Sequence, residues 1–372
     1  MKKCFKDFVR LKRGFDLPGK KRVSGEIPVY SANGISGFHN TPSCPAPGVI
    51  TGRSGTIGSV MYSQTPFWAL NTTLFVEEFK GNVPRFVYYF LLNFDLSRFT
   101  AGAVVPTLNR NDFSDISIDV PEKDEQLRIA SILGNLDERI EICRKKIALI
   151  RSFIERLYDY WFVQFKFPGH ECSDMMWNNK AKKNIPQHWT VGVLSDCADI
   201  TMGQSPDGAS YNVDRNGILF FQGATDFGEV FPSERQYTTS PTRYARGGDI
   251  LLSVRAPVGT MNVAMKDCCI GRGLAAIRGK CCCNSFIEIS LKKFAAVFAR
   301  KNGDGTTFGA ITKDELFGLP VIIPEKKILS SFGEIAIPLE KEITVEACKM
   351  SKLIEQRDWL LPMLMNGQVV VE

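Results

Sequence analysis

Two long stretches of this chain place apolar residues at alternating intervals of four and three. From Ile129 to Trp161 all ten such positions are apolar when Cys143 is included. A second stretch begins 203 residues later, at Phe332, and eight of its ten corresponding positions are apolar. An apolar seam that repeats every 3.5 residues is typical of helices in a coiled coil. The predicted seam consists of Ile129, Leu133, Leu136, Ile140, Ile147, Ile150, Ile154, Leu157, Trp161, Phe332, Leu339, Ile343, Met350, Leu353, Leu360 and Leu364.

A proline precedes each stretch, and we predict long helices over residues 121–166 and 324–366. The first seam would be about 50 Å long at ~1.5 Å per residue, and a lone helix would expose that apolar stripe to water. Each predicted helix follows a longer segment of the chain without this seam, so the order is segment, helix, segment, helix. We therefore predict that the second helix returns along the first as an antiparallel coiled coil. A helical hairpin inside a single core is the alternative, and ten unbroken seam positions argue against it.

The segments before the two helices also resemble each other. Gly14 matches Gly203 at an interval of 189 residues, and the interval grows to 203 at Pro121 and Pro324, so the second copy holds about 14 extra residues. Strand-like runs with Asn-Gly turns and glycines occur in both copies. We predict an α+β fold with a pseudo-twofold internal repeat. Two similar mixed α/β domains, residues 1–120 and 185–323, would be separated by the two helices, with a linker over 167–184 and a tail over 367–372.

Composition fits a globular protein. The 372 residues are 44% hydrophobic, which is enough to bury a core in each half. A net charge of +6 permits a nucleic-acid partner without requiring one. Met1-Lys2-Lys3 opens without the apolar run of a secretory signal, and no uncharged stretch reaches the roughly 20 residues of a membrane span. We therefore expect a cytoplasmic protein whose 11 cysteines are reduced thiols.

The sequence offers little for catalysis. None of the three histidines has a neighbour at the spacing of a metal site or a catalytic triad. The Gly-rich run at residues 52–59 lacks the Lys-Ser/Thr pair of a phosphate loop, so we interpret it as a turn between strands. Cys268-Cys269 and Cys281-Cys282-Cys283 suggest zinc, but adjacent thiolates reach one metal poorly. We expect no catalytic residue, no cofactor and no metal on this chain.

Polar loop residues are the candidates for binding. Arg53 and Arg255 follow the same strand in each copy, and arginine can contact guanine bidentately or clamp a phosphate. Either arginine could instead bind carbonyl groups of its own turn, and each loop residue could be ordinary solvated surface. The candidate DNA-binding residues are Lys20, Arg22, Asn33, Arg53, Asn109, Arg110, Gln204, Ser205, Gln222, Arg243, Arg246 and Arg255.

Several short motifs follow one another along the chain. They are Pro121 with Glu125-Gln126, Ile185-Pro186-x-x-Trp189, Gly203-Gln204-Ser205-Pro206, Gly223 after Phe-Gln, Gly248-Asp249-Ile250-Leu251, and Leu360-Leu361-Pro362-x-Leu364-Met365-Asn366-Gly367. Their order, together with the doubling, resembles the specificity subunit of type I restriction–modification systems over the whole chain. Two features depart from that pattern. The first half lacks the Pro-x-x-Trp opening, and Glu346 and Arg357 interrupt the second seam. Polar seam residues can fix helix register at a cost in stability, or they could simply be exposed near contacts with methyltransferase subunits.

The resemblance implies a non-catalytic subunit of a type I restriction endonuclease and adenine DNA methyltransferase complex. In that family two target-recognition domains each read one part of a split, asymmetric sequence in double-stranded DNA, and the two helices set the gap. Two methyltransferase subunits and two restriction/translocase subunits dock on it, and S-adenosylmethionine, ATP and Mg²⁺ would bind to those partners. The alternatives are a coiled-coil scaffold that presents two modules to protein partners without contacting DNA, and a stand-alone nuclease or methyltransferase, for which no motif is present.

Overall fold

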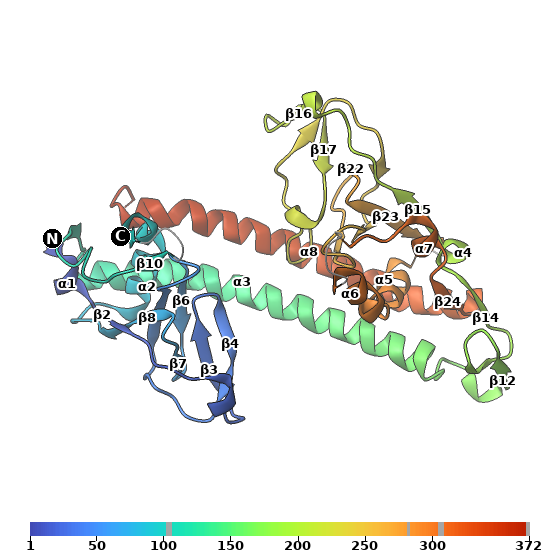
Figure 1. Cartoon of the computed structure of the whole chain (residues 1–372), viewed down its shortest axis with the longest axis horizontal. Coiled ribbons are helices and arrows are strands. Elements are labelled where there is room, and N and C mark those ends of the chain that lie inside the picture. The colour runs from blue at the N-terminus through green and yellow to red at the C-terminus, as the bar shows by residue number, and fades with distance from the viewer. Residues whose placement is uncertain (102–105, 281–282, 304–308, 370–372) are drawn as a thin grey trace. The chain divides into compact units, whose positions relative to one another are not determined.

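The computed structural model describes residues 1–101, 106–280, 283–303 and 309–369, which form two compact units. The first unit joins Met1–Ile142 to Met350–Glu372, and the second contains Cys143–Lys349. Two long helices, α3 (Lys123–Tyr158) and α8 (Lys326–Met365), each contribute one segment to both units (Figure 1). No helix among the described residues is both long and apolar enough to cross a membrane.

Two sheets form the framework of the first unit. A four-stranded antiparallel sheet has the order β2-β8-β5-β6, and a three-stranded sheet has the order β4-β3-β7, in which β3 and β7 are parallel. Every residue of β5 is buried, as expected for a strand that is covered on both faces. The elements before α3 are β1 (Lys2–Cys4), α1 (Phe5–Phe8), β2 (Arg10–Arg13), β3 (Ile27–Ser31), β4 (Gly34–His39), β5 (Gly48–Gly52), β6 (Val60–Ser63), β7 (Trp68–Ala69), β8 (Thr73–Glu78), α2 (Pro84–Asn93), β9 (Thr100–Ala101), β10 (Thr107–Leu108) and β11 (Ser117–Asp119).

The second unit repeats this framework. Its sheet β15-β23-β20-β21 has the same order, and the parallel pair of β17 and β22 corresponds to β3 and β7. Paired residues Tyr30 and Ala69 are 39 positions apart, whereas Phe221 and Ile270 are 49 apart, so ten of the extra residues of this half lie between these strands. The elements are β12 (Met175–Asn178), β13 (Lys183–Pro186), β14 (Thr190–Val193), α4 (Leu194–Cys197), β15 (Ala198–Met202), β16 (Tyr211–Asn212), β17 (Ile218–Phe221), β18 (Tyr237–Thr238), β19 (Tyr244–Ala245), β20 (Ile250–Ser253), β21 (Met261–Val263), β22 (Cys268–Ile270), β23 (Leu274–Gly279), α5 (Asn284–Lys292), α6 (Ala295–Gly303), α7 (Lys313–Phe317) and β24 (Pro320–Ile323).

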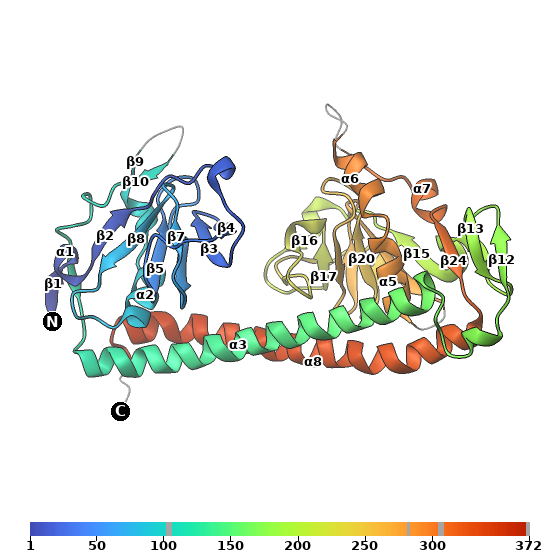
Figure 2. The same ribbon diagram turned by 90° about the horizontal axis from the view of Figure 1, so that it is seen from below.

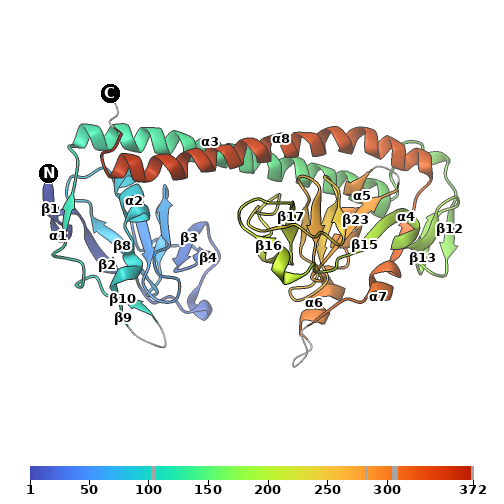
Figure 3. The same cartoon turned by 90° about the horizontal axis from the view of Figure 1, so that it is seen from above.

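In each unit the segments of α3 and α8 are antiparallel. In the second unit the ring of Tyr158, the last residue of α3, lies 6.5 Å from that of Phe332 near the beginning of α8. Further along, Lys146 of α3 contacts Glu346 of α8. The first unit combines the beginning of α3 with the end of α8, and the two segments lie side by side (Figures 2 and 3). The predicted return of the second helix along the first therefore agrees with the contacts in each unit.

The predicted seam is buried to different degrees. None of its residues is exposed, but Leu136, Ile150, Leu157, Leu339 and Leu360 are only half-buried. The two polar interruptions each meet an opposite charge on α3. Lys146 Nζ lies 2.8 Å from Glu346 Oε1, and Arg357 Nη1 lies 3.1 Å from Asp137 Oδ1. The remaining seam residues, all buried, are Ile129, Leu133, Ile140, Ile147, Ile154, Trp161, Phe332, Ile343, Met350, Leu353 and Leu364.

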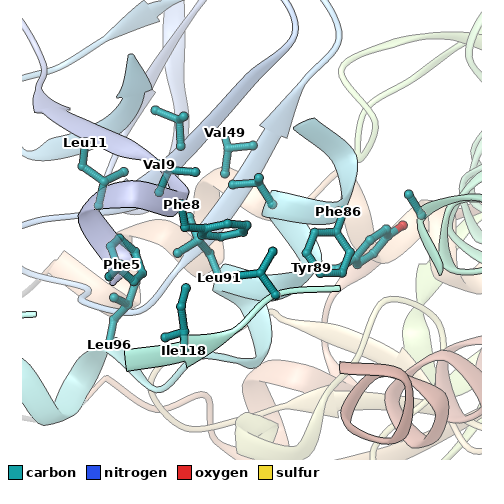
Figure 4. Packing of buried hydrophobic residues seen from close by; sticks show 14 of the residues in the cluster. Phe5, Phe8, Val9, Leu11, Val49, Phe86, Tyr89, Leu91, Leu96 and Ile118 are labelled. Carbon is teal, nitrogen blue, oxygen red and sulfur yellow. The ribbon is translucent and has the colours of Figure 1, made fainter. Parts of the chain in front are cut away.

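A buried aromatic cluster connects the sheet of the first unit to its helices (Figure 4). Phe5 and Phe8 of α1 are 2% and 0% exposed, and the ring of Phe8 lies edge-on to Phe90 of α2 at 4.7 Å. Pro84 begins α2, where its missing N–H has no intrahelical partner to lose. Leu133 of α3 belongs to the same cluster, so sheet and helices of this unit share one core.

The segment between the two halves is more structured than the sequence suggested. α3 ends at Tyr158, before the predicted boundary at 166, and a π-helical turn follows at Asp159–Val163. The predicted linker, residues 167–184, contains β12, which pairs with β13 in a hairpin. Phe167 stacks on Trp189 with ring centroids 5.1 Å apart. Aromatic packing therefore attaches the predicted linker to the rest of the second unit.

Candidate nucleic-acid interface

Several loops of the first unit meet at one end of its four-stranded sheet. β2 and β5 finish there and the antiparallel β8 begins there, because Gly14 N donates to Thr73 O at 3.0 Å and Arg53 N donates to Thr72 O at 2.8 Å. Leu108 N, in β10, donates to Arg53 O at 2.8 Å and so holds the last of these loops in place. Figures 2 and 3 show β10 on the side of the unit away from α2 and α3.

An open pocket of about 600 Å³ lies at this end, and Arg53, Asn109 and Arg110 line it as predicted candidates. Arg53 Nη1 lies 3.5 Å from Asn71 O, and Arg110 Nη1 donates to Leu11 O at 2.7 Å. These bonds fix the two guanidinium groups in the pocket wall. The other charged side chains in the lining are Lys12, Arg13 and Asp16.

The charge of this pocket is positive. Lys12 Nζ lies 2.7 Å from Glu77, an ion pair that also holds the pKa of Glu77 below its ordinary value. This pair neutralises Lys12. The lining still contains Arg13, Arg53 and Arg110 against a single carboxylate, Asp16. Such a surface attracts phosphates and the acceptor atoms of guanine.

The other three candidates of the first unit, Asn33, Arg22 and Lys20, do not line the pocket. The side-chain oxygen of Asn33 accepts a hydrogen bond from the Thr56 hydroxyl in the β5–β6 loop that follows Arg53. Arg22 instead donates from Nη1 to Ser36 O at 2.8 Å, which attaches the loop after β2 to β4. Lys20 is exposed on a short helical turn and is not part of the pocket lining. The structure thus connects Asn33 to the loop after Arg53 and gives Arg22 a structural contact elsewhere.

The corresponding end of the second unit gathers Ser205 and Gln222. Gly203 N donates to Leu274 O at 2.9 Å, as Gly14 N does to Thr73 O. Ser205 Oγ accepts hydrogen bonds from Gln222 Nε2 at 3.0 Å and from Arg272, whose N and Nε both lie at 3.3 Å. Arg272 was not among the candidates, although it is the charged member of this cluster.

Gln204 and Arg243 lie at the same end. Gln204 N donates to Ile270 O at 3.0 Å, and Ile270 N donates to Arg243 O at 2.9 Å. The Thr242 hydroxyl donates to Gln204 O, which closes the loop that precedes β19 over the loop that follows β15. Both predicted side chains are exposed here.

The position of Arg246 corrects the prediction that it lies with the other candidates. It follows β19, and three residues along a strand separate it from Arg243 by about 10 Å. Its N–H donates to Asp249 at 2.8 Å, and the next residue, Gly247, donates to Asp267 at 2.8 Å. Arg246 therefore lies at the opposite end of the strand, next to carboxylates, and does not join the other candidates.

Arg53 and Arg255 are not equivalent, which is a second correction. Leu108 and Ile311 correspond in the repeat, and their N–H groups donate to Arg53 O at 2.8 Å and to Val254 O at 3.0 Å, respectively. Arg53 thus corresponds to Val254, and Arg255 lies one residue further along. Because successive side chains of an extended strand point to opposite faces, the two arginines are presented differently. A one-residue shift between copies cannot be seen in a sequence comparison that tolerates gaps.

Arg272 was missed because its neighbours in sequence looked like an ordinary turn, although they contained a signal. Glycine stands on both sides of it, and a side chain at Gly271 would come within 2.7 Å of Gln222 Oε1, while one at Gly273 would come within 2.7 Å of Gln222 O. Only glycine allows the backbone to approach Gln222 this closely. The Gly-Arg-Gly sequence was therefore the available signal that an arginine is presented from a tightly seated backbone.

The described residues contain no group of three His, Cys, Asp or Glu side chains that could hold a metal ion. Cys268 and Cys269 are fully buried in β22, and burial raises the pKa of Cys268 to about 12, so this thiol stays protonated. Cys283 is buried as well, and Cys281 and Cys282 lie outside the described residues.

Known proteins share this sequence pattern. Residues 1–152 match the family model of the type I restriction modification DNA specificity domain. The chain is 27% identical over 299 residues to the putative type I restriction enzyme MjaX specificity subunit of Methanocaldococcus jannaschii. The aligned region covers 78% of this chain and 69% of that protein. It is 19% identical over 376 residues to the type I restriction enzyme HindI specificity subunit of Haemophilus influenzae, covering 81% of each.

The fold is shared too. The crystal structure of the S subunit of a type I restriction–modification system from M. genitalium superimposes with a TM-score of 0.63. The superposition covers 98% of this chain and 95% of that one at 16% sequence identity, so it shows a common mixed helix and strand fold.

Proposed function

We propose that this chain, which is similar to type I restriction enzyme specificity subunits over most of its length, is the DNA-reading subunit of such a complex. Each unit reads one part of a split, asymmetric sequence in double-stranded DNA with the loops at the end of its sheets. The chain itself carries out no reaction. Methyl transfer and cleavage belong to methyltransferase and restriction subunits, which would bind S-adenosylmethionine, ATP and Mg²⁺.

One observation supports this proposal most strongly. The same main-chain framework ends in polar loops in both units, but the side chains on those loops differ. The first unit presents Arg53 and Asn109 in an open pocket, and the second presents Ser205, Gln222 and Arg272. A protein that reads two different sequences with one fold requires this combination, since base contacts specify sequence whereas the framework only positions them.

The helices would set the gap between the two parts of the target. α3 has 36 residues and α8 has 40, which correspond to about 54 and 60 Å at ~1.5 Å per residue. One and a half turns of B-DNA measure roughly 50 Å, so helices of this length suit two readers that contact the duplex about one and a half turns apart. The ion pairs of Glu346 and Arg357 with α3 would fix the register of the helix pair.

The outer face of α3 is suited to a protein partner. Leu149 and Phe153 lie four residues apart on the segment of α3 that belongs to the second unit, and their exposed fractions are 72% and 51%. Apolar residues at such helical intervals form a stripe that another helix can cover. We assign this stripe to contacts with the methyltransferase subunits, which would also supply phosphate contacts that the modest charge of +6 leaves to them.

Mapping of DNA methylation tests the proposal. The chain is assembled with a type I methyltransferase subunit, genomic DNA is methylated, and modified adenines are located by sequencing. We expect one two-part motif with a fixed gap. Scattered methylation without such a motif contradicts the proposal. If the assembled complex also fails to shift duplex DNA in a gel at low salt, the scaffold alternative gains support instead.

A further inference from the structure

The two units place a pair of polar residues at equivalent positions. In the first unit the Asn71 side-chain amide donates to the Asp16 carboxylate. In the second unit Arg272 donates to Ser205. Gly14 donates to Thr73 at the start of β8, and Gly203 donates to Leu274 at the start of β23. Asp16 and Ser205 each lie two residues after the donating glycine. Asn71 and Arg272 each lie two residues before the accepting strand residue. The same two places are therefore occupied by different chemistry.

The second pair is held rigidly from several sides. Gly271 N donates to Phe221 O at 2.8 Å and Gly273 N donates to Gln222 O at 3.1 Å, so the backbone on both sides of Arg272 is attached to the end of β17. Ser205 Oγ engages the Nε of Arg272, and Gln222 holds Ser205 in turn. An anchored backbone and an anchored Nε restrict the rotamers of a side chain that otherwise loses much entropy on binding.

The two Nη groups of the Arg272 guanidinium are available to a ligand. Within the described part of the chain no hydrogen bond engages its two Nη groups, and the residue is exposed. Two adjacent N–H donors in one plane match the O6 and N7 acceptors that guanine presents in the major groove. In the first unit the Asn71 amide keeps one N–H and its oxygen beside the bond to Asp16, and a side-chain amide matches the N6 and N7 groups of adenine.

We propose that Arg272 reads a guanine in the part of the target bound by the second unit, and that Asn71, oriented by Asp16, reads an adenine at the corresponding step of the other part. This assignment rests on the proposed function and specifies the residues that perform it. Arg272 and Asn71 would be specificity-determining residues, and Ser205, Gln222 and Asp16 would position them.

The test uses the full chain assembled with its methyltransferase subunit. Arg272→Gln should relax or change one guanine in one part of the mapped motif and lower the methylation rate at the original sequence roughly 10- to 100-fold. The other part should remain as in the wild type. Arg272→Lys keeps the charge but not the planar fork, so it should weaken the guanine preference as well. Asn71→Ala should relax one adenine in the other part only.

Arg246→Gln is the matched control, since this exposed arginine of the same unit lies at the far end of its strand. It should leave both parts of the motif unchanged. If Arg272→Gln lowers methylation equally at all sequences and Arg272→Lys restores it, Arg272 contacts a phosphate and the inference is overturned. A two-part motif that Arg272→Gln does not alter overturns the inference alone. A wild-type complex without a two-part motif removes the proposed function and the inference with it.

Discussion

The contact between Asp137 and Arg357 gives a quantitative test of how the helices of the first unit are held together. Arg357 Nη1 lies 3.1 Å from Asp137 Oδ1, and the two side chains are 23% and 21% exposed. The other oxygen of Asp137 accepts a hydrogen bond from the hydroxyl of Tyr89, whose ring is fully buried. Burial and the adjacent carboxylate both raise the pKa of Tyr89, so its hydroxyl stays protonated and available as a donor.

Asp137→Ala removes both contacts. A hydrogen bond between charged groups contributes about 1.5–3 kcal/mol, and a buried hydroxyl left without its acceptor costs about 1–3 kcal/mol. Because water reaches part of this site, we expect the lower end of the sum, a loss of about 2–3 kcal/mol in the free energy of unfolding of the first unit. Tyr89→Phe alone should cost about 1 kcal/mol. The double variant should be less destabilised than the sum of the two, because Phe leaves no hydroxyl to satisfy.

Hydrogen exchange measured by mass spectrometry over a urea series separates the units, since peptides of α2 report on the first and peptides of α5 on the second. Glu138→Ala is the control, because Glu138 is 60% exposed and its pair with Arg85 contributes at most about 1 kcal/mol. A loss below about 0.5 kcal/mol for Asp137→Ala, or an equal loss in both units, would refute the reasoning.

Three further predictions concern pH and length. Burial raises the pKa of Glu340, so stability should fall as pH rises from about 4.5 through that raised pKa, and Glu340→Gln should flatten the fall in urea unfolding between about pH 4 and 8. Lys301 and Thr312 hold the pKa of Glu315 at about 2, so its contribution should be lost as pH falls from about 4.5 towards 2. Glu315→Gln should remove that acid dependence, with an effect below about 1 kcal/mol because the side chain is 41% exposed. Deleting residues 143–149 together with 343–349 shortens the helix pair by about 10 Å, which should shorten the mapped gap by about three base pairs. Methylation should also become slower, because the second reader must then meet DNA rotated by about 100°. Altered half-sites would contradict the spacer role.

The helices were the most predictable part of the molecule. A seam of period 3.5 over 33 residues is averaged over many positions, so single exceptions such as Glu346 and Arg357 did not obscure it. The sequence did not reveal which residues pair with Glu346 and Arg357. Lys146 and Asp137 are surface-like residues in the pattern, and only the antiparallel pairing brings them opposite the two polar seam positions.

The candidate site was harder to predict because it depends on register. Arg53, Asn109, Ser205 and Gln222 were predicted from their place after strands or in turns, where loops gather at the end of a sheet. Arg246 looked equally suitable, but the direction of β19 carries it to the other end of the strand. Loop residues acquire a position only from the strands that hold them, and a shift of one residue reverses the face on which a side chain lies.

The loops that bear the candidate residues are held mainly through the main chain, and this explains how one fold could read different sequences. Gly14 N binds Thr73 O in the first unit, and Gly203 N binds Leu274 O in the second. Such bonds do not depend on which side chain the next residues carry. Substitution at the positions of Asn71 or Arg272 should therefore change recognition while costing little stability, since surface substitutions without buried partners usually shift the free energy of unfolding by less than about 0.5 kcal/mol. The cores beneath, by contrast, tolerate no such freedom because each buried ring contacts several others. In this architecture the residues that determine stability and the residues that would determine sequence are thus physically separate, and a new specificity needs no new fold.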